Sequence, residues 1–154
     1  MSQPKTKERI WRYGLLLFWL LFIFFASTSS FSADNTSVIL RPVFLWFFPN
    51  LNDAQLATIH FLTRKLAHFS EYAILAFLAH RALIASSGES LRRHWFLLTT
   101  LLVVVYSLLD EFHQSFVPSR TPSLYDSCID IAGGLTVLLI FRFYNQRQHR
   151  RSLA

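Results

Sequence analysis

The chain has 154 residues, of which 53% are hydrophobic and 16% are charged, and it contains 16 phenylalanines. This composition is too apolar and too aromatic for an ordinary soluble domain, so it predicts a membrane protein. The net charge of +6 does not indicate nucleic-acid binding, because most lysines and arginines flank long apolar runs, where basic residues act as topology signals. The single cysteine, Cys128, cannot form an intramolecular disulfide and is expected to pack as a small apolar side chain.

The first apolar run starts at Tyr13 and reaches Phe31 without a charged residue. Its length approaches the ~20 residues that span a bilayer, so we expect a membrane helix over residues 13–31. A cleaved signal peptide is the competing interpretation, because the run ends in small residues of the cleavage-site type. The next segment, residues 38–50, is apolar but too short to span, which favours an interfacial or re-entrant piece. Its connection to the second span is predicted to end in a helix near the membrane surface, with Asn52 or Asp53 as N-cap.

Three further spans are expected at residues 65–86, 95–114 and 124–144. In the last of them, Gly133 and Gly134 allow a neighbouring helix to approach closely. The predicted fold class is therefore all-α: a polytopic bundle of four transmembrane helices, with the interfacial or re-entrant segment between the first and second. We expect a single domain over residues 1–154.

The basic residues predict the orientation of this bundle. Eleven of the 15 lysines and arginines lie in three segments, namely the N-terminus, the loop between spans two and three, and the C-terminus. Four spans place these segments on one side, and the positive-inside rule assigns that side to the cytoplasm. The other four basic residues then lie outside: Arg41, Arg64, Lys65 and Arg120.

Five of the nine carboxylates fall within the predicted spans or at their edges. A charged side chain is costly in lipid, so these residues must face a protein interior or water and find partners. The second span starts at the outer surface, the third ends there and the fourth starts there again, so all five acids are expected at a similar depth near that surface. They are Glu71, Asp110, Glu111, Asp126 and Asp130.

Polar residues repeat at helical spacing on each of these spans, so three polar stripes can converge on one cavity. The short turn between spans three and four would place Arg120 over the mouth of that cavity. The stripes are Lys65, His68, Glu71 and Tyr72 on the second span, Asp110, His113 and Gln114 on the third, and Ser123, Asp126 and Asp130 on the fourth.

Two interpretations of the stripes compete. In the first, Lys65 and Arg120 neutralise some of the acids, and the others form a hydrogen-bonded network that fixes helix packing. In the second, the histidines and carboxylates act as general acid and base or bind a metal, while Lys65 and Arg120 hold an anionic group such as a phosphate. We favour the second interpretation, because helix packing needs only one or two such residues per helix.

These residues leave open whether the protein binds a divalent metal. His68, His113 and Glu111 are the candidate ligands, since imidazole and carboxylate groups bind zinc or manganese. The spacings HExxH, HxH and CxxC are all absent, so the sequence does not indicate a metal strongly.

Three motifs resemble the VanZ-like family of bacterial membrane proteins: RKLAHFSEYAIL, SLLDEFHQSFVPSRTPSLYD, and D-x-x-x-D followed by IAGG. The resemblance covers residues 64–138. One departure is Asp130, which stands where an asparagine is expected and adds a carboxylate. Position by position, the resemblance implies His68, Glu71, Asp110, Glu111 and His113 as catalytic candidates, and Lys65, Tyr72, Gln114, Arg120, Asp126 and Asp130 as substrate-binding candidates.

The resemblance implies a multi-pass protein of the bacterial cytoplasmic membrane with cytoplasmic termini, and the family's namesake is associated with resistance to the glycopeptide teicoplanin. It implies no particular reaction. We expect the cavity to bind an anionic envelope component at the outer leaflet, such as a lipid-linked cell-wall precursor or a phospholipid headgroup. A non-catalytic resistance factor and a small transporter are the alternatives, although four spans without an inverted repeat argue against a monomeric transporter. Oligomeric state is left open.

Overall fold

The computed structural model describes residues 6–153 and shows an all-helical protein, without a strand in this part of the chain. The predicted all-α class is confirmed. Four long helices form the bundle: α1 (Thr6–Ala26), α3 (Asp53–Ile84), α5 (Trp95–Gln114) and α6 (Leu124–Leu153). Three short helices connect them: η1 (Ser29–Phe31), α2 (Ala33–Phe47) and α4 (Glu89–Arg93).

Three of the long helices are long and apolar enough to cross a membrane: α1, α5 and residues 124–148 of α6. Their outward faces carry exposed large apolar side chains, such as Leu17 and Phe18 on α1, as lipid contact requires. At 32 residues, or about 48 Å, α3 is also long enough, but it carries Arg64, Lys65 and Glu71 in its middle. Apolar composition therefore supports three of the four expected spans, and α3 as a span stays a prediction.

Two predicted boundaries differ from the structure. α1 ends at Ala26 rather than near residue 31, and the serine-rich segment after it forms a turn and η1. The predicted surface helix and the second span form one continuous helix, because no glycine or proline interrupts residues 53–84. The start of α3 is fixed by a capping box, in which Asn52 and Gln55 exchange hydrogen bonds of 2.9 and 3.0 Å.

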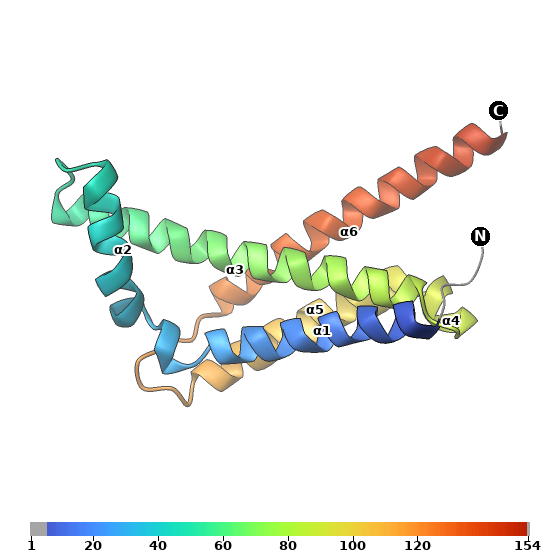
Figure 1. Ribbon diagram of the computed structural model, residues 1–154, viewed down its shortest axis with the longest axis horizontal. Helices are drawn as coiled ribbons and strands as arrows, with labels where there is room; N and C mark the ends of the chain where they lie inside the picture. Colours follow the sequence, from blue (N-terminus) through green and yellow to red (C-terminus); the bar gives the residue numbers. More distant parts are fainter. Residues whose placement is uncertain (1–5, 154) are drawn as a thin grey trace.

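Residues 38–47, part of the expected interfacial or re-entrant piece, belong to α2. The side chain of Ser32 caps this helix by accepting a hydrogen bond from the Asn35 backbone N–H, and Pro42 lies inside it. α2 and the first turns of α3 project past the end of α1 that leads into η1 (Figure 1). The position of α2 relative to a membrane stays a prediction.

The elements that carry basic segments gather at one end of the molecule. The start of α1, the short helix α4 and the end of α6 lie there, while η1 and the turn of residues 115–123 lie at the opposite end (Figure 1). This arrangement is the one that alternating spans produce.

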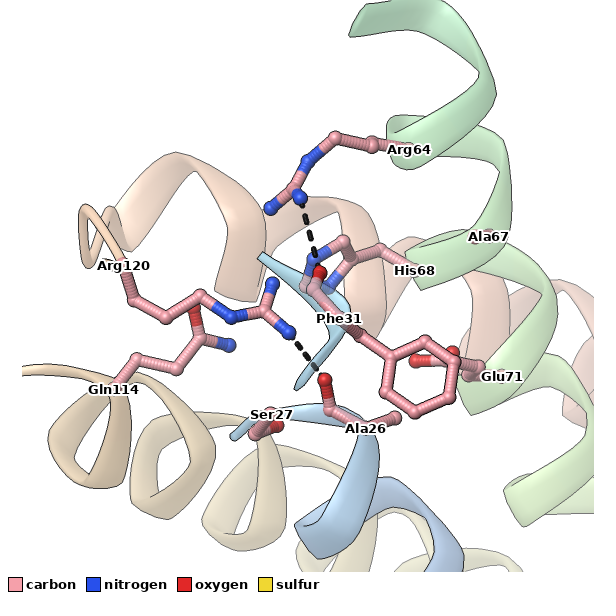
Figure 2. A pocket seen from close by; sticks show the side chains of 9 residues that line it. All are labelled: Ala26, Ser27, Phe31, Arg64, Ala67, His68, Glu71, Gln114 and Arg120. Carbon is pink, nitrogen blue, oxygen red and sulfur yellow. Dashed lines mark hydrogen bonds between the residues drawn. The ribbon is translucent and has the colours of Figure 1, made fainter. Parts of the chain in front are cut away.

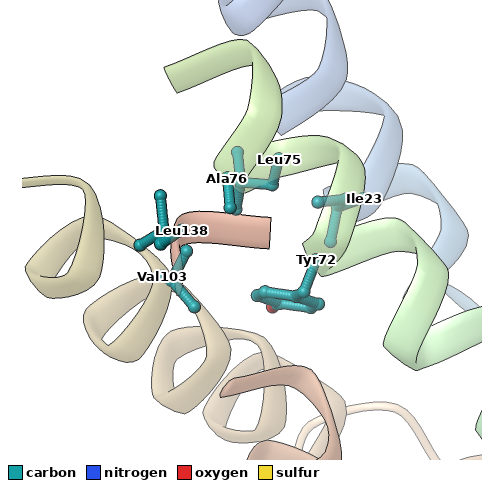
Figure 3. Packing of buried hydrophobic residues seen from close by; sticks show 6 residues of the cluster. All are labelled: Ile23, Tyr72, Leu75, Ala76, Val103 and Leu138. Atoms are coloured by element: carbon teal, nitrogen blue, oxygen red, sulfur yellow. The ribbon is translucent and has the colours of Figure 1, made fainter. Parts of the chain in front are cut away.

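A small apolar core holds the bundle together at mid-length, where all four long helices contribute side chains (Figure 3). Its buried members are Ile23, Tyr72, Leu75, Ala76, Val103 and Leu138. The predicted close approach at the paired glycines is confirmed. A Cβ on Gly133 would lie 2.1 Å from the Phe69 carbonyl oxygen of α3, and one on Gly134 would lie 2.7 Å from Val103 of α5. Glycine is thus required for α6 to pack between α3 and α5.

We expect Gly133→Ala to lower the midpoint of thermal unfolding in detergent. The new methyl group would collide with backbone atoms of α3, which no side-chain rotation relieves, and overpacking typically costs about 1–3 kcal/mol. Gly14→Ala is the matched control, because its Cβ would meet no atom within 4 Å and alanine favours a helix. A Gly133→Ala protein that unfolds at the wild-type temperature would contradict this packing.

Candidate functional site

The predicted polar stripes converge where α1 and α5 end and α6 begins. We call Glu71, Asp110, Glu111, Asp126 and Asp130 the acidic cluster. Asp130 is fully buried, three other members are less than a tenth exposed, and only Glu71 is partly exposed. The structure therefore brings together carboxylates from three helices.

Asp130 of α6 is held from two sides. Its Oδ1 lies 3.1 Å from Nδ1 of His68 on α3, and its Oδ2 accepts a 3.1 Å hydrogen bond from the Ser107 hydroxyl on α5. An aspartate bonded to one ring nitrogen orients the imidazole and selects its tautomer, which leaves Nε2 for another partner. Sequence reasoning missed Ser107, although it precedes Asp110 by three residues and so shares its helix face.

Asp110 is held by α1 and by its own helix. The Ser27 hydroxyl, just after α1, donates a buried hydrogen bond to Oδ1, and Gln114 Nε2 donates to Oδ2 at 3.1 Å. Ser27 lies in the serine-rich segment that suggested a cleavage site, and no periodic pattern marks it as a site residue. Its bond makes α1 part of the site.

Two further acids of the cluster, Asp126 and Glu111, form contacts at the start of α6. Lys65 forms an ion pair with Asp126, so its ammonium group is engaged by the protein rather than free for the predicted anion. Glu111 Oε2 accepts a 2.6 Å hydrogen bond from the Ser123 backbone N–H, one residue before α6. The other Glu111 oxygen is buried without a partner.

Two arginines stand beside the acids without pairing with them. Arg120 donates from Nη2 to the Ala26 carbonyl and from Nε to the Thr28 carbonyl at 3.1 Å, so it caps the end of α1. Arg64, which the sequence did not single out as a site residue, donates to the Phe31 carbonyl at 3.2 Å. Within residues 6–153, neither guanidinium forms a salt bridge.

These two guanidinium groups also repel one another. Burial and the neighbouring charge of Arg64 lower the pKa of Arg120 from its usual value. Arginine nevertheless keeps its proton at physiological pH, so the site holds two nearby positive charges that only carbonyl oxygens meet. Such a pair is suited to an anion.

A polar cavity of about 60 Å³ lies between these groups (Figure 2). Its volume suits a few water molecules or one small polar group, not a whole lipid. Arg64 reaches toward it from α3 and Arg120 from the turn between α5 and α6 (Figure 2). We define the polar cavity by its lining: Ala26, Ser27, Phe31, Arg64, Ala67, His68, Glu71, Gln114 and Arg120.

Seven of the eleven predicted residues do not line the cavity, and two of these, His113 and Tyr72, pack against apolar groups. The ring of His113 stacks on Phe24 of α1, with centroids 4.4 Å apart, so it contacts α1 instead of lining the cavity. Tyr72 is fully buried in the apolar core. Of the eleven predicted residues, four line the cavity: His68, Glu71, Gln114 and Arg120.

One group of possible metal ligands comes together in the part of the chain that the structure describes. Ligand atoms of His68, Asp110 and Asp130 lie within 4.8 Å of one another, and all three residues are buried. The set shares only His68 with the ligands that the sequence suggested. His113 and Glu111 are engaged elsewhere, with Phe24 and Ser123 respectively.

We expect Ser27→Ala to lower the thermal unfolding midpoint, because a buried carboxylate then loses a donor, which costs about 1–3 kcal/mol. Ser29→Ala is the control, since that serine is exposed in η1. Equal midpoints for the two variants would show that the contact between Ser27 and Asp110 does not stabilise the fold.

The site and the bundle can be placed in a family. The family described as VanZ/LLP1 matches residues 10–145, a range that includes every residue of the acidic cluster and the polar cavity. No curated protein and no solved structure matches the chain. Together with the three apolar helices, the family match identifies a multi-pass membrane protein. In agreement with the motifs of residues 64–138, the chain belongs to the VanZ/LLP1 family.

Proposed function

We propose that this protein binds an anionic envelope component at the outer face of the bacterial cytoplasmic membrane, with the charged group of the ligand in the polar cavity. The observation that carries the proposal is the pair of guanidiniums, Arg64 and Arg120, which border the cavity and form no salt bridge with any described residue. Arginine forks bind phosphate and carboxylate groups strongly. A phospholipid headgroup and the phosphate of a lipid-linked cell-wall precursor share this chemistry.

The proposal includes α3 as a fourth span. Residues 64–84 of α3 cover about 30 Å, which is the thickness of the bilayer interior. His68, Tyr72 and His80 on this segment are buried within the bundle, so its polar groups avoid lipid. Four spans put the start of α1, α4 and the end of α6 on the cytoplasmic side, which places the cavity outside.

The location of α2 fits an interfacial rather than a re-entrant role. Val38, Ile39, Trp46 and Phe47 are all more than half exposed, and α2 adjoins the end of the bundle where the cavity lies. Exposed tryptophan and apolar side chains of this kind favour the headgroup region. We propose that α2 rests there and lies beside the bound lipid.

The residues below the arginines support acid/base chemistry on the ligand. Asp130 orients His68, and Glu71 lines the same cavity without a hydrogen bond from its side chain to the described residues. An oriented imidazole and an unengaged carboxylate are the groups that general acid/base catalysis uses. We propose Glu71 and His68 as the reacting pair, with Asp110, Gln114 and Ser27 fixing the surrounding geometry.

Binding of the anion is tested with purified protein in nanodiscs of neutral lipid, to which phosphatidylglycerol is added. We expect Arg64→Gln to weaken retention of the anionic lipid about tenfold, as loss of a charge-assisted hydrogen bond predicts. Arg93→Gln is the matched control, because Arg93 is an exposed arginine on α4, at the opposite end of the bundle (Figure 1). Equal retention by wild type and Arg64→Gln, or an equal loss in both variants, would refute the anion site.

Glu71→Gln separates catalysis from binding alone. If the cavity is reactive, this variant keeps its affinity for anionic lipid but loses the cellular phenotype, which we propose to read as tolerance to a glycopeptide antibiotic. A Glu71→Gln protein with full phenotype would instead indicate a non-catalytic binder or resistance factor.

The orientation is tested by cysteine labelling in a Cys128→Ser background. We expect a membrane-impermeant maleimide to label Ser119→Cys in intact cells, because that exposed residue lies in the turn beside the cavity. Ser87→Cys, exposed between α3 and α4, should react only after lysis. The reverse pattern would place the cavity in the cytoplasm and exclude an outer-leaflet ligand.

A further inference from the structure

When ionised, the five carboxylates of the acidic cluster carry more negative charge than the salt bridges around them neutralise. Lys65 pairs with Asp126, and His68 contacts Asp130. No ion pair to Glu71, Asp110 or Glu111 exists within residues 6–153. Uncompensated carboxylates are costly in a membrane interior, so the cluster favours an additional cation.

Three groups in the cluster have the composition of a metal site. His68 supplies an imidazole and Asp110 and Asp130 supply carboxylates, from α3, α5 and α6 respectively. Their ligand atoms lie within 4.8 Å of one another, whereas two ligands of a tetrahedral zinc ion are about 3.4 Å apart for bonds of ~2.1 Å. Side-chain rotations that move the donors together by about 1 Å would therefore complete the site.

Hydrogen bonds from neighbouring side chains orient both carboxylates, as they usually orient metal ligands. Ser27 and Gln114 donate to Asp110, and Ser107 donates to Asp130. These donors approach from α1 and α5 and restrict both carboxylates. Acids that only had to be separated from one another would not need this many hydrogen-bond donors.

The buried hydroxyl of Tyr72 independently indicates that the cluster binds a further ligand. Tyr72 is fully buried, and its hydroxyl has no hydrogen-bond partner among the residues that the structure describes. On α3 it lies one helical turn beyond His68, and Asp110 and Asp130 are close enough to interact with it electrostatically. Figure 3 shows its ring turned toward the interior between the helices. Buried hydroxyl groups nearly always have a partner, and a water or other ligand on a metal at the cluster would provide one.

We propose that His68, Asp110 and Asp130 bind a divalent transition-metal ion of the zinc or manganese class. One imidazole with two carboxylates is a borderline donor set that suits these ions better than calcium or copper(I). Three protein ligands leave an open position, the arrangement of catalytic rather than structural zinc sites. His68 lines the polar cavity, so the ion would lie beside the anion site, and an ion bound to His68 would leave Glu71 as the acid/base group there. Action of the metal on that anion rests on the proposed function, whereas metal binding itself does not.

The test uses full-length protein in nanodiscs of neutral lipid, stripped with a chelator and then equilibrated with zinc or manganese chloride. Bound metal per protein is measured by mass spectrometry after desalting. We expect about one equivalent of one of these ions on the wild type, and at least a tenfold loss of affinity in Asp130→Asn and in Asp110→Asn. Both substitutions keep the side-chain shape, and size-exclusion chromatography verifies folding.

Two controls separate a specific site from general attraction to acids. Asp126→Asn removes a carboxylate of the same cluster that pairs with Lys65, and His113→Ala removes the histidine that stacks on Phe24. Both variants should keep wild-type metal affinity. A wild type that binds neither ion, or an equal loss of affinity in Asp126→Asn, would overturn the metal site. Neither of these two results would change the retention of anionic lipid by a protein that keeps Arg64. The metal proposal can therefore fail while the anion site stands.

Discussion

The contact between His68 and Asp130 is the interaction on which the geometry of the site depends. It joins α3 to α6 where Asp130 is fully buried and the His68 side chain is 11% exposed, and Ser107 of α5 completes the arrangement. The contact exists because Gly133, three residues after Asp130, lets α6 touch the backbone of α3. A larger residue there would separate the helices and leave a fully buried carboxylate without its partner. Close packing and polar chemistry are therefore products of the same short segment of α6.

The end of α1 is joined to this centre through polar groups rather than apolar packing alone. Ser27 donates to Asp110, and Arg120 donates to the carbonyls of Ala26 and Thr28. The last carbonyls of a helix have no partners within the helix, so the guanidinium satisfies groups that lipid could not. This role also holds Arg120 beside the cavity. The residue thus stabilises the end of α1 and supplies part of the positive charge of the site.

The sequence predicted much of this architecture because hydropathy and helical spacing are local properties. The helical class, the approximate ends of α5 and the convergence of acids from three helices all followed from those patterns. The continuity of α3 could also have been predicted, since residues 53–84 contain no glycine or proline, but we predicted a surface helix before a separate span from residue 65. Polar residues need not end a helix when it can bury them.

What the sequence could not predict was the pairing of individual groups. Lys65 and Arg64 are adjacent, yet one pairs with Asp126 and the other donates to a carbonyl, and only tertiary placement decides between them. Ser27 and Ser107 follow no pattern that separates a hydrogen-bond donor to a buried acid from an ordinary serine. By its spacing, His113 shares a helix face with Asp110, but its ring stacks on Phe24 of α1. Neighbouring helices thus determine which member of a polar stripe enters the site.

The charges of the site are separated in a way that suits two ligands of opposite sign. Within residues 6–153, the guanidiniums of Arg64 and Arg120 donate only to carbonyl oxygens, while Asp110 and Asp130 are held by hydroxyl and amide donors and by His68. If the acids served only to neutralise the arginines, direct ion pairs would be the lower-energy arrangement in a medium of low dielectric constant. Instead, helix packing holds the two sets apart with the polar cavity next to both. A bound anion would neutralise the arginines and a bound cation the aspartates, so each proposed ligand would stabilise the charge that the fold leaves unpaired.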